Sequence, residues 1–114
     1  MREEWIKYWR KNNFDFIISP GFGCSATDHG FSNDCSLVAA YVYLWNVLAL
    51  PSCSLPVSIV REDELNYESK WDDEFTKAIR KTVSTSQGLP VNIQVIGLPF
   101  SEEGILGVAK VIES

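Results

Sequence analysis

The residues from 21 to 36 concentrate the side-chain types that serve nucleotide, metal and nucleophilic chemistry. Gly21-Phe22-Gly23-Cys24-Ser25-Ala26 matches the G-x-G-x-x-G/A pattern, whose glycines let the backbone approach a pyrophosphate. The context differs from a dinucleotide site, because Pro20 intervenes after the preceding strand and no apolar-periodic helix begins at the loop. No acidic residue follows about 20 positions later. The pattern therefore favours a glycine-rich turn.

The same stretch contains the residue types of a zinc site and of a hydrolytic triad. Zinc would need cysteine, histidine or acidic ligands, but neither a C-x-x-C pair nor two histidines at ligand spacing occur. A triad would join Ser25, Asp28 and His29, yet no G-x-S-x-G turn presents the serine. We therefore assign no catalytic residue, no metal ligand and no cofactor to this chain. The metal ligands considered are Cys24, Asp28, His29, Asp34 and Cys35.

Large aromatic side chains are the other group with a chemical use. The chain has four tryptophans, and pockets for apolar ligands are lined mainly by apolar and aromatic side chains. We expect most of the tryptophans to lie in the core and a minority to line a ligand cavity. The acidic residues between 62 and 74 are expected to form a solvated face, because no pattern pairs two of them for acid and base catalysis.

Hydrophobic periodicity predicts four helices that alternate with three strands. Helices are expected at residues 3–12, at 37–48, within the polar connector 61–88, and after Ser101. In the connector, Trp71, Phe75 and Ile79 form one apolar stripe at four-residue spacing. Strands are predicted at residues 14–18, 55–60 and 89–96, the last packed mainly on one face. This alternation is typical of an α/β layered sheet. The helix at 37–48 is apolar on nearly all sides, so it must be buried by more protein.

Length and charge bound the class of protein. A chain of 114 residues with 46% apolar residues suits one domain or a piece of one. The net charge of −5 argues against a nucleic-acid partner, because that affinity comes mainly from lysine and arginine. The first fourteen residues are too charged for a signal peptide, and no apolar run reaches the roughly 20 residues of a spanning helix. We expect an intracellular protein, cytoplasmic or peripheral to a membrane, with reduced cysteines.

Three groups of short motifs follow one another along the chain. They are Phe14-Asp15-Phe16-Ile17-Ile18-Ser19-Pro20, then Tyr41-Val42-Tyr43-Leu44-Trp45-Asn46 with Pro51 and Leu55-Pro56-Val57, and finally Gly88-Leu89-Pro90-Val91-Asn92-Ile93-Gln94-Val95-Ile96-Gly97 with Pro99-Phe100 and Glu102-Glu103. In this order they resemble the carboxyl-terminal part of the amidase signature family. The Gly-Leu-Pro-Val-x-Ile-Gln run is the most specific piece. The long connector and the aromatic-rich helix resemble the fatty acid amide hydrolase branch of that family.

The resemblance implies that residues 1–114 form the carboxyl-terminal fragment of an amidase, with a partial mixed β-sheet and flanking helices. It implies hydrolysis of carboxamides, without a cofactor, by a serine nucleophile, a second serine in a cis peptide and a lysine. All three would lie on a Ser/Gly-rich core upstream, so we expect this chain alone to be inactive. An activated nucleophile beside its base, and an oxyanion site, would both come from that core.

The resemblance also points to substrate-binding residues. In the lipid-amide branch, an aromatic on the helix before the Gly-Leu-Pro strand lines the acyl channel. Phe75 falls near that position, with Trp71 one turn earlier. The alternative, that both side chains only anchor the helix on the sheet, stays open. Asn92 stands where the family has a small residue, so its side chain is expected to narrow the space beside the sheet.

A function from a different class also stays open. The chain could be a stand-alone pseudoenzyme or an α/β module that binds a lipid or a protein. A piece of a larger enzyme should expose a large apolar patch on the helix at 37–48, whereas a module should unfold cooperatively as a monomer. The expected partner of the full enzyme is a hydrophobic amide. Attachment to a membrane surface through Trp5 and Trp9, and a homodimer, are further options.

Overall fold

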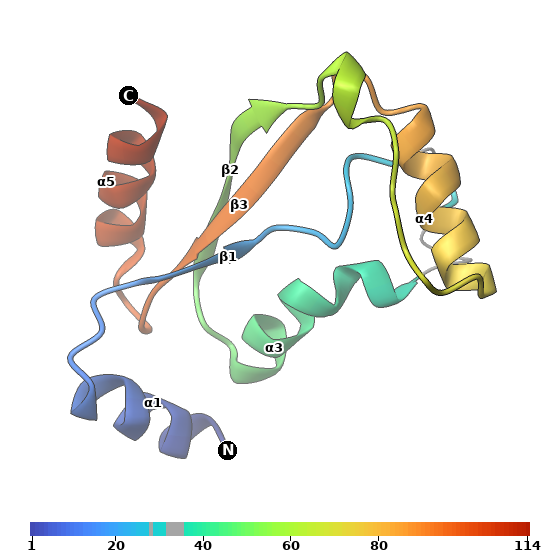
Figure 1. The fold of residues 1–114 in the computed structure, drawn as a ribbon. Coiled ribbons are helices and arrows are strands. Elements are labelled where there is room, and N and C mark those ends of the chain that lie inside the picture. The colour runs from blue at the N-terminus through green and yellow to red at the C-terminus, as the bar shows by residue number, and fades with distance from the viewer. Residues whose placement is uncertain (28, 32–35) are drawn as a thin grey trace.

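The computed structural model describes residues 1–27, 29–31 and 36–114 (Figure 1). In this described part, helices α1 (Arg2–Lys11), α3 (Ala40–Leu48), α4 (Glu74–Ser84) and α5 (Glu102–Glu113) alternate with strands β1 (Ile17–Pro20), β2 (Ser52–Ile59) and β3 (Pro90–Ile96). Two short 3₁₀ helices cover Ser36–Ala39 and Glu62–Glu64. The predicted α/β class and the predicted order of elements are confirmed.

The three strands form one sheet in the order β1-β3-β2, with both pairs antiparallel. The two similar Leu-Pro-Val strands lie side by side, and Leu55 of β2 is opposite Ile93 of β3. Pro56 lies at a bulge on an edge strand, where a missing amide donor is tolerated. β1 begins three residues later than predicted and extends to Pro20, which is also tolerated because β1 is an edge.

Helices cover both faces of the sheet (Figure 1). Val95 points toward α5 and packs with Leu55, Ile105 and Ala109. The next residue, Ile96, points the opposite way and packs with residues of α1 and α3, which are Trp9, Trp45 and Leu48. The prediction that β3 packs mainly on one face is therefore wrong at its carboxyl end, where both faces are buried. Alternation indicates two faces, but it does not reveal that each face has its own helices.

The amphipathic helix α1 agrees with its predicted pattern. Trp9 is 1% exposed, and its indole Nε1 donates to the carbonyl of Phe14 at 2.5 Å. The helix ends at Lys11 with Asn12 as its C-cap, and Asn13 adopts a positive φ of 52° that turns the chain toward β1. The side chain of Trp9 therefore lies in the core between α1 and the sheet, ahead of the first strand.

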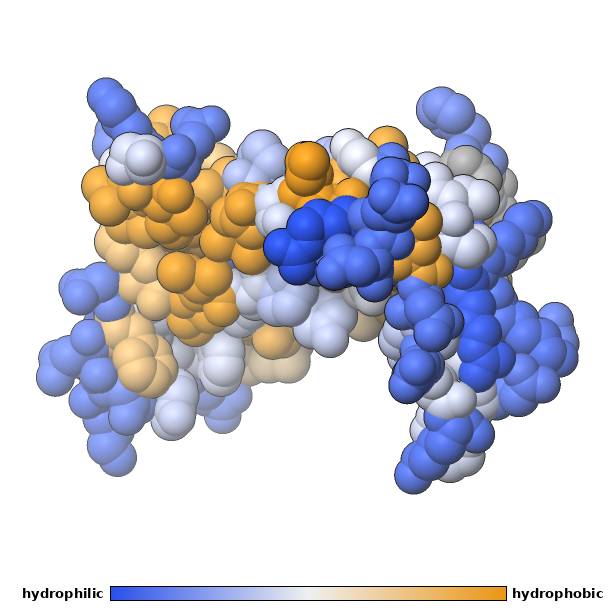
Figure 2. Space-filling model, turned by 45° about the horizontal axis from the view of Figure 1, so that its top comes forward, coloured by the Kyte–Doolittle hydropathy of each residue, from blue (hydrophilic) through white to orange (hydrophobic). Residues whose placement is uncertain are grey.

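The aromatic-rich helix α3 is only partly covered by the described part of the chain. It begins after a 3₁₀ turn and buries Trp45 and Leu48. Leu37 and Val47 are 68% and 64% exposed, and Tyr41 and Leu44 are also exposed. Figure 2 brings the top of Figure 1 forward, away from α3; on this other face apolar side chains gather in the upper left and centre, whereas the right end is largely hydrophilic. Neither α3 nor any other helix within residues 1–27, 29–31 and 36–114 has the length and apolarity needed to cross a membrane.

Two glycines near the carboxyl end give opposite predictions for the same substitution. A Cβ on Gly97 would come within 2.9 Å of Ile105 and would also overlap the Ser101 hydroxyl, whereas Gly107 in α5 has nothing within 4 Å. We expect G97A to lower the free energy of unfolding by about 1–3 kcal/mol through overpacking. G107A should raise it by about 0.5–1 kcal/mol, because alanine loses less backbone entropy in a helix. Urea unfolding of both variants tests this, and equal effects would contradict the packing at Gly97.

Candidate functional site

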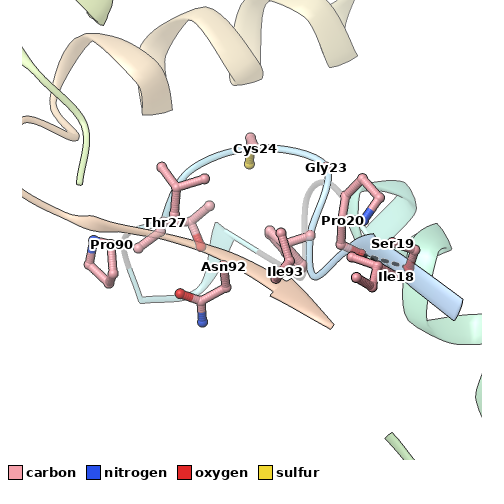
Figure 3. A pocket seen from close by; sticks show the side chains of 12 residues that line it. Ile18, Ser19, Pro20, Gly23, Cys24, Thr27, Pro90, Asn92 and Ile93 are labelled. Carbon is pink, nitrogen blue, oxygen red and sulfur yellow. Dashed lines mark hydrogen bonds between the residues drawn. The ribbon is translucent and has the colours of Figure 1, made fainter. Parts of the chain in front are cut away.

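The described structure contains an open, mostly apolar pocket where the chain leaves β1. Its volume is about 660 Å³, within the range of small-molecule sites. In Figure 3 the loop carrying Gly23, Cys24 and Thr27 arches over β3, and Ile93 lies beneath it. Residues from β1, this loop and β3 line the pocket, and they are Ile18, Ser19, Pro20, Phe22, Gly23, Cys24, Ala26, Thr27, Pro90, Val91, Asn92 and Ile93. The arrangement suits an apolar group.

The glycines of the nucleotide-like motif have a packing role. The Gly23 amide donates to the carbonyl of Val38 at 2.8 Å, and a Cβ on Gly23 would lie only 3.0 Å from that oxygen. Gly21 likewise approaches β3, with its amide 3.1 Å from the carbonyl of Asn92. Both glycines are therefore placed where the backbone of the loop contacts neighbouring backbone, as expected for a glycine-rich turn.

The other candidates in this loop are separated in the structure or lie outside its described part. Asp28, Asp34 and Cys35 are outside the described residues. His29 is exposed, whereas the Ser25 hydroxyl is buried and has no hydrogen-bond partner among the described residues. The structure thus does not join Ser25 to His29, and no catalytic residue is assigned.

Two polar residues of β3 organise the sheet beside the pocket. Asn92 lines the pocket, and its Nδ2 is 3.3 Å from the Ser54 hydroxyl on β2. Gln94 is 3% exposed, and its Nε2 lies 2.9–3.0 Å from the Ser19 hydroxyl and from the carbonyls of Pro20 and Tyr41, which share its two hydrogens. This one side chain therefore links β3, β1 and α3. Sequence reasoning gave Gln94 no role, although a glutamine flanked by apolar strand residues is a signal for a buried amide.

The two substrate-binding residues implied by the resemblance lie at the start of α4. Phe75 is in its first turn and 41% exposed, whereas Trp71 precedes the helix and is 63% exposed. The predicted helical stripe is therefore wrong for Trp71, because α4 begins only at Glu74. Ile79, the third residue of the predicted stripe, is buried and packs with Val38. Neither aromatic lines the pocket described above, and their exposure leaves both side chains available for contact.

Asp73, among the predicted solvated acidic residues, caps α4. Its carboxylate accepts a hydrogen bond from the Thr76 amide at 2.7 Å, and this bond holds the pKa of Asp73 below its usual value. Because the pKa of Asp73 is lower in the folded state, its ionised carboxylate stabilises the helix at pH values above the unfolded pKa of 3.8. This stabilisation is lost as pH falls through the folded-state pKa.

We therefore expect the Thr76 amide to be protected from hydrogen exchange, with a protection factor that is constant near neutral pH. After correction for intrinsic exchange, this protection should fall in acid below pH 3.8. D73N should keep a cap but lose this acid dependence, since asparagine does not titrate. D73A should reduce protection at every pH. Asp15→Asn, in the segment before β1, is the matched control. An unchanged acid profile in D73N would contradict the assignment.

Comparisons with known proteins place the chain in a family. The Amidase family model matches residues 1–106. The chain is 30% identical to fatty-acid amide hydrolase 1 of Sus scrofa over 98% of its own length and 20% of that protein. It is 28% identical to fatty acid amide hydrolase 1 of Caenorhabditis elegans, over 98% of this chain and 20% of that one. An amidase of Gibberella moniliformis is also 28% identical, over 97% of this chain and 18% of its own length. The chain thus spans about a fifth of these relatives, and it belongs to the Amidase family.

Proposed function

We propose that this chain is the carboxyl-terminal portion of an amidase resembling fatty acid amide hydrolase, and that the whole enzyme hydrolyses the carboxamide bond of a hydrophobic amide. The observation that carries the proposal is the similarity to two fatty acid amide hydrolases over 98% of the chain. The serine nucleophile, the second serine and the lysine are supplied by the upstream core. The serine attacks the amide carbonyl, and its proton passes through the second serine to the lysine. The C–N bond then breaks, the leaving amine takes that proton, and water hydrolyses the acyl-serine to the free acid.

The contribution of this chain is then scaffold and substrate contact. Gln94 holds the sheet together, and the sheet supports the apolar pocket beside β1. Trp71 and Phe75 are the proposed contacts for the hydrophobic part of the amide, since large exposed aromatics bind apolar groups well. The carboxamide itself is held by the upstream core. The chain expressed alone should therefore be inactive.

The test identifies the native polypeptide in its own cells. An antibody against residues 102–114 should capture a protein several times heavier than 12.9 kDa that is labelled by a serine-directed fluorophosphonate and hydrolyses oleamide. The purified 114-residue chain should release no ammonia from oleamide. A native product of 12.9 kDa without label would overturn the proposal, as would turnover by the chain alone that the same probe abolishes.

The alternative is a stand-alone binding module, in which the exposed apolar residues of α3 would be the surface that contacts a lipid or a protein. Such a module needs its own stable core. Cooperative urea unfolding of the monomeric chain, with no binding of hydrophobic dye, would support it. Aggregation or strong dye binding would support the enzyme portion, because α3 would then be a surface that further protein covers.

A further inference from the structure

The segment of residues 69–72, just before α4, is held against that helix by one side chain. In Figure 1 the connector runs beside α4 before entering it. From within the helix, Arg80 reaches back to this segment. Its Nη1 donates to the carboxylate of Asp72 at 2.6 Å, and its Nη2 donates to the carbonyls of Ser69 and Trp71, each at 3.0 Å. All three acceptors precede the helix, so the contacts position the segment.

Arginine is well suited to this arrangement. Its guanidinium is planar and directs several N–H groups at fixed angles, whereas a lysine ammonium is a compact charge on a flexible stem. The bond to Asp72 is also an ion pair, so both of its partners carry charge. A further bond joins the Trp71 amide to the Ser69 hydroxyl at 3.2 Å. The backbone of Trp71 is thus held through both its carbonyl and its amide.

The backbone of Trp71 is held by hydrogen bonds, whereas its side chain is exposed. It is 63% exposed, and the Lys70 ammonium lies 5.1 Å from its ring centroid. An exposed tryptophan on a fixed backbone loses less conformational entropy on binding than one on a mobile loop. Tryptophan is also among the side chains that contribute most at binding surfaces. Phe75, in the first turn of α4 after the Asp73 cap, is a second exposed aromatic side chain.

We propose that Arg80 is a positioning residue, whose hydrogen bonds to residues 69–72 hold Trp71 ready to contact the acyl chain of a hydrophobic amide. This inference rests on the proposed function, in which Trp71 and Phe75 meet that chain. Arg80 itself does not touch the substrate. Its loss should therefore weaken binding of long-chain amides and leave the chemical step unchanged.

The test compares amides of different length on the native polypeptide that contains this chain, expressed from its complete reading frame. R80Q should raise KM for oleamide about tenfold with kcat unchanged, as expected when binding alone is lost. KM for a short aryl amide that does not reach Trp71 should change less than about twofold. R80K should fall between the parent and R80Q. Lys81→Gln, the neighbouring exposed position on α4, is the matched control and should behave like the parent.

A spectroscopic readout reports the position of Trp71 separately from activity. With 5-fluorotryptophan incorporated, the fluorine resonance missing from W71F belongs to Trp71. In R80Q this resonance should move and sharpen, while those of Trp9 and Trp45 stay in place. D72N, which keeps Arg80 but removes the negative charge of one acceptor, should produce a smaller shift. D72N therefore still tests the positioning of Trp71 if R80Q fails to fold.

The outcomes separate the inference from the proposed function. An unchanged Trp71 resonance in R80Q and D72N would overturn the positioning role, whatever the enzyme hydrolyses. Equal KM changes for oleamide and the short amide would overturn the acyl contact. If the parent protein hydrolyses neither amide and its Trp71 resonance does not shift when oleamide is added, the proposed function and the acyl contact are both rejected. If that resonance still shifts in R80Q, the role of Arg80 in positioning Trp71 stands.

Discussion

Gln94→Glu should destabilise the fold by more than about 3 kcal/mol at neutral pH, because a buried carboxylate would face two carbonyl oxygens without a proton to donate. In the parent, Gln94 supplies those protons to Pro20 and Tyr41. Q94L should cost less than Q94E but still about 1–3 kcal/mol for each carbonyl left buried without a donor. Urea unfolding measures both variants.

The control for this prediction is the same change at an exposed position. Gln87→Glu lies at the surface shortly before β3, and it should alter the free energy of unfolding by less than about 0.5 kcal/mol. Acid supplies a second check, since the introduced carboxyl group regains one donor when it is protonated, and Q94E should recover part of its stability as pH falls. A Q94E variant as stable as Q87E at neutral pH would contradict the buried link between β3, β1 and α3.

Trp9→Ala should lower the free energy of unfolding by about 3–5 kcal/mol, the usual cost of removing a large aromatic from a packed core. Trp9 is 1% exposed and packs with Trp45, Leu48, Leu50 and Ile96 in the core cluster between the helices and the sheet. W9F should cost less, because it retains most of the apolar volume and loses mainly the hydrogen bond to Phe14.

Trp71→Ala is the matched control for this prediction, because the same side chain is removed at an exposed position. It should cost less than about 1 kcal/mol. Chemical unfolding followed by far-ultraviolet circular dichroism compares the variants without relying on tryptophan fluorescence. Similar losses for W9A and W71A would show that α1 is not packed on the sheet as described.

The elements with strong internal periodicity could be predicted from the sequence. Trp5 and Trp9 mark the buried side of α1, and the alternation of Val91, Ile93 and Val95 marks β3. The boundaries depend on contacts that periodicity does not contain. β1 starts late because the residues before it complete the turn out of α1, where Asn13 has a positive φ and the Phe14 carbonyl accepts from Trp9.

The candidate site was less accessible to sequence reasoning because its key contacts join distant residues. Gln94 reaches Pro20 across 74 positions, and Arg80 holds a carbonyl 11 positions earlier. The stripe at four-residue spacing suggested that Trp71 belongs to a helix, but α4 begins after the Asp73 cap. The spacing of Asp73 and Thr76 could have indicated where α4 begins, since an aspartate three residues before a helix amide is a common N-cap arrangement. The contacts of Arg80 had no such signal.

The place of β3 in the sheet has a consequence for the order in which the protein can form during synthesis. β1 and β2 each pair with β3 and not with each other, yet β3 is the last of the three strands to leave the ribosome. Until residue 96 has emerged, β1 and β2 lack β3, the only strand that pairs with them in the described part of the chain. A nascent chain of this kind gains these two strand pairings in one late step, and until then the open edges of β1 and β2 can pair with other chains.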